Sequence, residues 1–301
     1  MAFNIRRGSP HPTKNTTASD VALLADVPKR RRAAFAQSRP FWQREKGRCG
    51  VTMFLKADNL SKTYSSGFLS GKKVSALQNA SITIRDGETV GIFGKSGSGK
   101  TTLVKLLLGF YEPNKGGIRV GNVLLKDMNP HVWRAHTGCV MQDGFIFSDT
   151  IARNIAVGAE SIDKERLLHA VTVANIREFI DSLPLGYNTK IGMEGNGVSQ
   201  GQRQRILIAR AVYKNPEFIF LDEATNALDA NNEKEIMEHL HQFYRGRTVV
   251  VVAHRLSTVR DADNIVVLDK GRIAEEGTHE ELTARRGIYY KLVKNQLELG
   301  S

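Results

Sequence analysis

The sequence predicts an α/β fold built on a mainly parallel β-sheet. After residue 54, short runs rich in β-branched and apolar residues alternate with segments of helical character, and this alternation is typical of parallel sheets covered by helices. The apolar run Val249–Ala253 is of strand length. No apolar run approaches the roughly 18–20 residues that a membrane-spanning helix needs.

The strands and helices can be assigned in order from these runs. In the first half, strands are expected at Phe54–Ala57, Ala80–Ile84, Glu88–Phe93, Ile118–Val120 and Gly138–Met141. In the second half, they are expected at Phe218–Leu221, Thr248–Val252, Asn264–Leu268 and Arg272–Ala274. One helix should begin at the glycines after Phe93 and run through Leu108, and two short amphipathic helices should close the chain.

Residues 150–185 have a different pattern. Apolar residues such as Ile151, Leu167 and Ile180 recur there at roughly helical spacing. The pattern predicts an all-helical insertion that continues into the helix following Ser199. We place this helical subdomain at about residues 143–214.

The positive charge of the chain is concentrated at its beginning. The net charge is +12, of which residues 1–56 carry +9, from 12 Lys and Arg against 3 Asp and Glu. We expect residues 1–54 to form a basic, disordered extension and residues 55–301 to form the folded domain. Binding of the extension to anionic lipid or nucleic acid is the alternative. The two cysteines, Cys49 and Cys139, have no metal-ligand neighbours.

The segment Gly94–Thr101 matches the phosphate-binding pattern G-x-x-x-x-G-K-[ST] without a gap. It follows a predicted strand and precedes an apolar helix, which is the context that the pattern requires. Its glycines let backbone N–H groups converge on a β-phosphate, where side chains would obstruct them. Lys100 would neutralise β- and γ-phosphate oxygens, and the Thr101 hydroxyl would ligate Mg²⁺. The sequence therefore predicts a P-loop NTPase core.

The segment Phe218–Glu223 supplies two adjacent carboxylates at the end of a buried strand. Because side chains alternate along a strand, the two carboxylates should point in different directions. Asp222 would reach the Mg²⁺ shell, and Glu223 would orient and deprotonate the attacking water. A pair of surface acids after a strand is the alternative.

Three further residues are candidates for the same site. The ring of Tyr64 could stack on adenine, although it could also be an ordinary half-buried strand residue. Gln142 follows an apolar run and could touch Mg²⁺ or water. His254 follows the run Val249–Ala253 and so emerges at the end of a strand, beside the expected γ-phosphate. A purely structural histidine is the alternative there.

The segment Gly197–Gly201 has two incompatible interpretations. It fits G-x-S-x-G, the elbow that exposes the nucleophilic serine of a hydrolase, and Asp222, Asp229 and His254 follow in the order of such a triad. The same residues could instead start a helix whose backbone N–H groups face a phosphate. An elbow needs a buried strand just before the serine, whereas residues 187–194 are mainly polar and include Gly192, which makes them a poor strand.

These motifs together resemble the nucleotide-binding domain of ABC transporters over about residues 55–298. The resemblance is specific because several motifs occur in order. Along the chain they are the aromatic loop at Tyr64, the Walker A loop at Gly94, Lys95, Ser96, Gly97, Ser98, Gly99, Lys100, Thr101 and Thr102, the Q-loop at Gln142, the ABC signature at Val198–Gln202, Walker B at Phe218–Glu223, the D-loop at Ala227–Asp229 and the switch histidine at His254.

The resemblance implies a fold and a site. The fold would add an antiparallel β subdomain and an α-helical subdomain to the parallel core, and the cofactors would be ATP and Mg²⁺. Ser199, Gly201, Gln202 and Asp229 would join the Walker A loop and Tyr64 in binding nucleotide across a head-to-tail dimer. The catalytic residues would be Glu223, His254, Lys100 and Gln142, and the metal ligands would be Thr101, Gln142 and Asp222.

The resemblance also implies a function: an ATPase that powers transmembrane transport. The second half is most similar to bacterial peptide and bacteriocin exporters, so export of a peptide or related substrate is favoured, whereas the insertion Gly67–Lys73 looks like importer ATPases. The expected partners are a second ATP-binding domain and a transmembrane domain, on a separate chain or missing from this one, at the cytoplasmic side of the plasma membrane. Nucleic acid is not an expected partner.

Three alternatives remain open from the sequence. The chain could be an importer ATPase, or a non-transport ABC ATPase that acts on nucleic acid or ribosomes through its basic extension. It could also bind ATP without hydrolysing it, because Gln200 replaces the first glycine of the usual Ser-Gly-Gly-Gln signature. The chain itself could be a stand-alone subunit, a fragment or a junction of two lineages.

Overall fold

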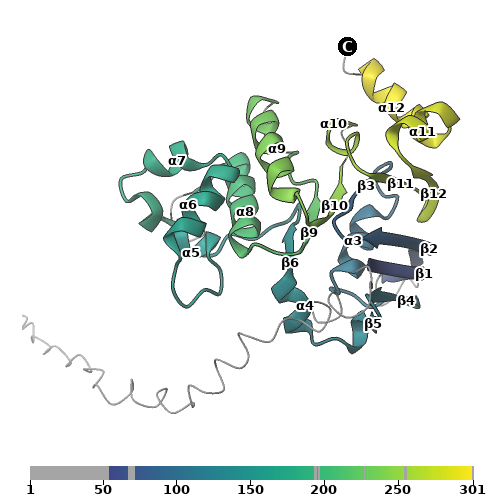
Figure 1. Ribbon diagram of the computed structural model, residues 1–301, viewed down its shortest axis with the longest axis horizontal. Coiled ribbons are helices and arrows are strands. Elements are labelled where there is room, and N and C mark those ends of the chain that lie inside the picture. The colour runs from purple at the N-terminus through teal and green to yellow at the C-terminus, as the bar shows by residue number, and fades with distance from the viewer. Residues whose placement is uncertain are drawn as a thin grey trace, which may run out of the picture.

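The structure is a computed structural model that describes residues 54–66, 72–192, 195, 197–226, 228, 230–253 and 256–299. A parallel-sheet core lies in the centre of Figure 1, with an antiparallel sheet on one side and a group of helices on the other. None of the helices in these ranges combines the length and the apolar character needed to cross a membrane. Most of the predicted N-terminal extension, and residues 67–71 of the importer-like insertion, lie outside the described residues.

The central sheet has six strands in the order β12-β11-β3-β10-β9-β6. All neighbouring pairs are parallel except β11 with β12, so the predicted α/β fold with a mainly parallel sheet is confirmed. The strands are β3 (Thr89–Phe93), β6 (Thr137–Val140), β9 (Phe218–Asp222), β10 (Thr248–Val252), β11 (Asn264–Asp269) and β12 (Arg272–Gly277).

The strands of this sheet are apolar throughout because both faces are buried. In β10, Val249 and Val251 belong to one core cluster, whereas Val250 and Val252 belong to the other. This is the two-residue alternation of a strand, with each face packed against its own layer.

One layer consists of an antiparallel sheet and two helices. The sheet, of order β2-β1-β4-β5, shares its core cluster with α3 and the central sheet. Trp133 of α4 also packs into this layer, with its ring centroid 5.1 Å from that of Phe218. The elements are β1 (Phe54–Ser66), β2 (Lys72–Arg85), α3 (Lys100–Leu107), β4 (Lys115–Val120), β5 (Val123–Leu124), the 3₁₀ turn η2 (Leu125–Asp127) and α4 (Pro130–His136).

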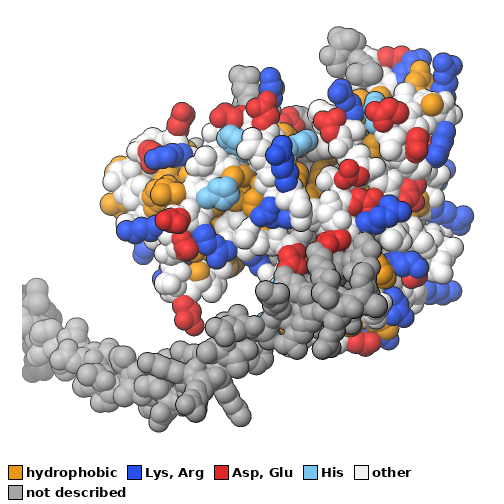
Figure 2. Space-filling model, viewed as in Figure 1, with side chains coloured by type: hydrophobic (Ala, Val, Ile, Leu, Met, Phe, Trp, Pro, Cys, Tyr) orange, Lys and Arg blue, Asp and Glu red, His pale blue; other side chains and the backbone are white. Residues whose placement is uncertain are grey.

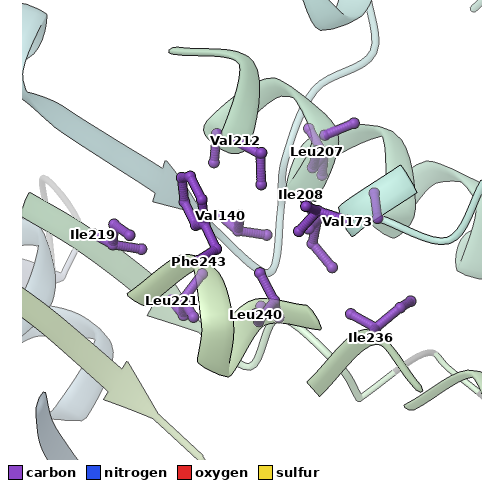
Figure 3. Packing of buried hydrophobic residues seen from close by; sticks show 14 of the residues in the cluster. Val140, Val173, Leu207, Ile208, Val212, Ile219, Leu221, Ile236, Leu240 and Phe243 are labelled. Atoms are coloured by element: carbon purple, nitrogen blue, oxygen red, sulfur yellow. The ribbon is translucent and has the colours of Figure 1, made fainter. Parts of the chain in front are cut away.

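The other face of the sheet is covered by α8 (Gln200–Lys214) and α9 (Ala230–Tyr244). Figure 3 shows side chains of both helices converging on strands β6 and β9. The labelled residues are Leu207, Ile208 and Val212 from α8, Ile236, Leu240 and Phe243 from α9, Ile219 and Leu221 from β9, Val140 from β6, and Val173 from α6 (Lys164–Val173). Helix α8 is therefore fixed directly to the strand that ends at Asp222.

The predicted helical insertion contains three short helices, which lie with α8 at one end of the molecule (Figure 1). It also contains a strand pair, in which Asp149 and Thr150 pair antiparallel with Ile191 and Lys190. The helical periodicity of this region does not predict that pair. A strand of two residues has no alternating pattern that a sequence could reveal. The elements are β7 (Asp149–Thr150), α5 (Ile151–Ile155), α6 (Lys164–Val173), α7 (Arg177–Asp181), the 3₁₀ turn η3 (Gly186–Asn188) and β8 (Lys190–Ile191).

The chain ends in α10 (Leu256–Val259), α11 (His279–Arg285) and α12 (Ile288–Leu299). Tyr289 of α12 is fully buried and its ring lies 5.6 Å from that of Phe93, the last residue of β3. Near the other end of α12, Gln296 accepts a 3.2 Å hydrogen bond from the backbone N–H of Leu256. The last helix therefore contacts both the end of β3 and the start of α10.

The described surface in Figure 2 carries charges of both signs. On this face, Lys and Arg side chains are interspersed with Asp and Glu side chains. This agrees with the near balance of residues 57–301, in which 31 Lys and Arg face 28 Asp and Glu. The basic excess of the chain belongs to the segment before residue 57.

Candidate functional site

The direction of the parallel strands brings the Gly94–Thr101 loop and the carboxylates of Asp222 and Glu223 to one edge of the central sheet. Val252 of β10 is paired with Ile92 of β3 on one side and with Asp222 of β9 on the other. Because the strands are parallel, their carboxyl ends meet at one edge of the sheet. The loop after Phe93 and the pair Asp222–Glu223 therefore lie at the same edge, with only the end of β10 between their strands.

The loop between β3 and α3 has a conformation that only glycine allows at two points. Gly94 and Gly99 have φ angles of 153° and 102°. A Cβ at Gly94 would lie 2.3 Å from the carbonyl oxygen of Leu268, and one at Gly99 would lie 2.4 Å from that of Ala76. Gly97 also has a positive φ, 75°, but a Cβ there would meet nothing within 4 Å. The two ends of the loop, at Gly94 and Gly99, therefore pack closely against the backbone of other segments, whereas the space around Gly97 is free.

Lys100 closes this loop from inside. Its side chain is buried, and Nζ donates hydrogen bonds of 2.8 Å to the carbonyl oxygen of Gly94 and 2.9 Å to that of Lys95. An ammonium group has three donors, so one remains for an anion. Burial lowers the pKa of Lys100, and the carboxylates of Glu223 and Asp222 oppose that shift.

The other loop residues divide between the interior and the surface. Lys95 and Ser96 are exposed, whereas Thr101 and Thr102 at the start of α3 are half-buried. Ser98 is buried, and its hydroxyl has no hydrogen-bond partner among the described residues. The loop is therefore accessible at its tip and carries an unpartnered buried hydroxyl at its base.

Asp222 is buried at the end of β9. Its side chain is 1% exposed, and neither carboxylate oxygen has a well-formed hydrogen-bond partner within the described ranges. Burial raises the pKa of Asp222, the hydroxyl of Thr101 opposes the shift, and the Glu223 carboxylate adds to it. A buried, unpartnered carboxylate beside a hydroxyl is an oxygen donor set that suits a hard divalent cation such as Mg²⁺. The residues present therefore fit this metal.

Glu223 has an unusual backbone that is held on both sides. Its φ is 54°, in the left-handed region, which is uncommon for a residue with a side chain. Its N–H donates 3.0 Å to the carbonyl of Val252, and its carbonyl accepts 3.0 Å from Nε2 of Gln204. Its carboxylate oxygen Oε2 accepts 2.7 Å from Nδ2 of Asn226. Sequence reasoning did not identify Gln204 or Asn226.

Tyr64 lies on β1, opposite Val74 of β2. Two residues farther along β2, the backbone carbonyl of Ala76 is the group that Gly99 approaches, so this stretch of β1 and β2 borders the loop. The Tyr64 ring meets that of Tyr111 edge-on at 6.0 Å. Tyr111, which is 43% exposed, is a second aromatic neighbour that the sequence analysis did not identify.

Gln142 is exposed just beyond β6, at the same sheet edge as Asp222. Ser199, Gly201 and Gln202 lie instead at the start of α8, and among the described residues they make no hydrogen bond with the Gly94–Thr101 loop or with the two carboxylates. Two predicted site residues, Asp229 and His254, lie outside the described ranges.

The start of α8 is pre-formed. Ser199 Oγ accepts 3.2 Å from the N–H of Gln202, and Gln202 Oε1 accepts 2.8 Å from the N–H of Ser199, which makes a reciprocal cap. Gln200 is exposed, so its side chain does not prevent this cap. Residues 195, 197 and 198 form no strand, in contrast to what a nucleophile elbow requires.

A family model described as ABC transporter matches residues 77–226 of this chain. That region contains the loop with Lys100, the exposed Gln142, the capped Ser199 and both carboxylates. The domain that contains these residues belongs to the ABC transporter family. It is an ATP-binding domain, and domains of this family hydrolyse ATP to drive transport. The predicted membership and fold are both confirmed.

Relatives of this ABC domain include a flippase, a toxin translocation protein and an exporter of known structure. It is 48% identical over 221 residues to an ATP-dependent lipid A-core flippase of Saccharophagus degradans, covering 73% of this chain and 38% of that protein. It is 45% identical over 223 residues to the toxin RTX-I translocation ATP-binding protein of Actinobacillus pleuropneumoniae, covering 74% and 32%. A solved structure of a bacterial Atm1-family ABC exporter with ATP bound has a TM-score of 0.74 and 37% identity, covering 81% and 42%.

The chain spans less than half of the length of each of these three proteins. The similarity places its ABC domain with the ATP-binding domains of exporters, as the sequence predicted.

Proposed function

We propose that this chain is the ATP-hydrolysing part of an exporter in which two ATP-binding domains enclose ATP at their interface. The observation that carries the proposal is the arrangement of Lys100 and Asp222. The lysine is buried inside a glycine loop and has one donor left, and the carboxylate is buried near it beside the Thr101 hydroxyl, with no well-formed hydrogen bond among the described residues. A triphosphate with its metal would satisfy both groups.

The residues of the chain would divide the work as follows. Lys100 and the loop N–H groups bind the phosphates, and Tyr64 stacks on the adenine. Thr101, Asp222 and Gln142 would hold Mg²⁺, which supplies neutralisation of phosphate charge when bound. Glu223 orients the attacking water and takes its proton on the carboxylate. We assign His254 to the γ-phosphate.

The second half of the site would come from another ATP-binding domain. Ser199, Gly201 and Gln202 lie at a capped helix start, where backbone N–H groups and the helix dipole favour an anion. They make no hydrogen bond with the described phosphate loop of their own chain, so we assign them, with Asp229, to the nucleotide of the partner domain. A homodimer in head-to-tail orientation satisfies this arrangement.

The membrane part of the transporter would be a transmembrane domain on a separate chain or on a longer form of this one. We place the ABC domain at the cytoplasmic side of the plasma membrane, attached through that partner. The relatives named for lipid A and toxin translocation support export as the direction. We propose a peptide or related molecule as the cargo, from the similarity of the second half to peptide exporters.

Nucleotide binding and turnover by the purified chain test the proposal. Calorimetry with ATP and Mg²⁺ should show binding by the native chain and by Glu223→Gln, and little or none by Lys100→Ala. Turnover of Glu223→Gln should fall by about 10²–10⁴ because the general base is lost. Lys126→Ala, which removes an exposed lysine, is the matched control and should behave like the native chain.

Two results would refute the proposal. One is a well-folded native chain that takes up no nucleotide. The other is native-like hydrolysis by Glu223→Gln, which would remove Glu223 from the role assigned to it.

A further inference from the structure

Helix α8 makes a direct contact with the residue that we assign as general base. Gln204 lies on the second turn of this helix, with only 8% of its surface exposed. Its Nε2 donates a 3.0 Å hydrogen bond to the backbone carbonyl of Glu223, 19 residues away in sequence. A side chain of α8 thus donates a hydrogen bond to the residue that directly follows β9.

The contact matters because of the conformation that Glu223 adopts. The left-handed region is unfavourable for a residue other than glycine, and such a conformation persists only where the surroundings enforce it. Here the N–H of Glu223 is held by Val252 of β10, and its carbonyl accepts from Nε2 of Gln204 on α8 and, at 3.3 Å, from the N–H of Asn226 in its own turn. Since the direction of a side chain follows from its backbone, these bonds together set where the carboxylate points, and the bond from Gln204 ties that direction to α8.

Gln204 itself is held in place by the helix. Its neighbours Ile206, Leu207 and Ile208 are buried in the cluster that joins α8 to β6 and β9. The helix backbone that carries this amide is therefore fixed to the central sheet. A rigid helix that carries one buried donor is a suitable device for fixing a strained backbone.

We infer that Gln204 is a positioning residue for ATP hydrolysis: it holds the backbone of Glu223 in the left-handed conformation that aims the carboxylate at the attacking water. The inference rests on the proposed function, because it needs Glu223 to be the general base. Gln204 touches neither phosphate nor water in this role. Its loss should therefore reduce turnover and leave nucleotide binding intact.

The test is Gln204→Met in the full 301-residue chain, which keeps the length of the side chain and removes the donor. We expect kcat to fall about 10–100-fold, while the Kd for ATP with Mg²⁺ changes less than about twofold. Gln242→Met makes the same chemical change at an exposed position on α9 and should leave both constants unchanged. Gln204→Asn, whose amide is one methylene shorter, should repeat the loss if the Met variant folds poorly.

A double-mutant cycle separates positioning from general damage. If Gln204 acts only through Glu223, adding Gln204→Met to Glu223→Gln should leave the residual turnover unchanged. Additive losses, or a kcat of Gln204→Met within about twofold of native, would overturn the inference. Failure of the native chain to bind nucleotide would overturn the proposed function instead, so the two failures are distinguishable.

Discussion

Nδ2 of Asn226 donates a 2.7 Å hydrogen bond to Oε2 of Glu223. The two residues lie on one turn, in which the N–H of Asn226 also approaches the carbonyl of Glu223 at 3.3 Å. The backbone of Glu223 is held by Gln204 and Val252, and its carboxylate is held by Asn226. The general base that we propose is therefore oriented at both ends.

Substitution of Asn226 should reduce hydrolysis according to what replaces the amide. Asn226→Ala removes the donor, and we expect kcat to fall about 3–10-fold because one hydrogen bond to a charged group is lost. Asn226→Asp should cost more, since it places a second negative charge within hydrogen-bond distance of the first. Steady-state ATPase assays measure both. Asn122→Asp, which adds the same charge at an exposed turn, is the control, and the opposite ranking of Ala and Asp would contradict the assignment.

Substitutions at two glycines of the phosphate loop should affect different properties: Gly99→Ala should mainly lower stability, and Gly97→Ala should mainly weaken ATP binding. Gly99→Ala drives a Cβ into the carbonyl of Ala76, so we expect a loss of at least about 2 kcal/mol in the free energy of unfolding. Gly97→Ala meets open space and should cost only about 1 kcal/mol from its positive φ. Its methyl group should nevertheless obstruct the phosphates and weaken ATP binding. Urea unfolding without nucleotide, followed by calorimetry, checks both, and equal unfolding losses would contradict the close approach.

Replacing the buried carboxylate at the end of β9 should stabilise the nucleotide-free domain. Asp222→Asn removes the cost of burying an unpartnered charge, so we expect a higher Tm together with loss of the Mg²⁺-dependent part of ATP affinity. The exposed Asp127 offers Asp127→Asn as a matched control that changes neither. A lower Tm for Asp222→Asn would show that the carboxylate is satisfied in the folded state.

The same substitution should change how stability depends on pH. Burial raises the pKa of Asp222 above its usual 3.8, so between that value and the raised one the folded state binds more protons than the unfolded state. The free energy of unfolding of the native chain should therefore fall as pH rises through this window. Asp222→Asn should lack this contribution, and urea unfolding at several pH values would reveal a growing advantage of the variant.

Tyr64 should matter for the base of the nucleotide and not for its phosphates. Stacking on an aromatic side chain contributes about 1–3 kcal/mol per base, so Tyr64→Ala should weaken ATP binding roughly 5–150-fold, whereas Tyr64→Phe keeps the ring. Inorganic tripolyphosphate carries no base, and its affinity should be the same in all three proteins. Equal weakening for both ligands would mean that Tyr64 acts through the fold.

The parts of the site that could be predicted are those whose residues follow one another directly along the chain. A strand, a glycine loop and a helix follow one another from Thr89 to Leu107, so local pattern and local conformation coincide. The same holds for the buried strand that ends at Asp222. Because all these strands are parallel, predicting each one was enough to predict that their ends meet.

The parts that could not be predicted depend on contacts between distant segments. The bond from Gln204 to Glu223 requires the packing of α8 on β9 and a left-handed glutamate, and no propensity favours either locally. Tyr111 reaches Tyr64 only after the turn that follows α3. The strand pair of Asp149–Thr150 with Lys190–Ile191 is too short to have a pattern.

The packing of α12 has a practical consequence for handling the protein. Tyr289 packs against the last residue of β3, and Gln296 holds the first residue of α10. A version of the protein that is truncated before residue 289, by design or by proteolysis during purification, would lose the Tyr289 ring that packs on Phe93, just before the Gly94–Thr101 loop. Affinity tags and fluorescent labels are therefore better attached at the amino end, and a preparation that has lost activity on storage should first be checked by intact mass.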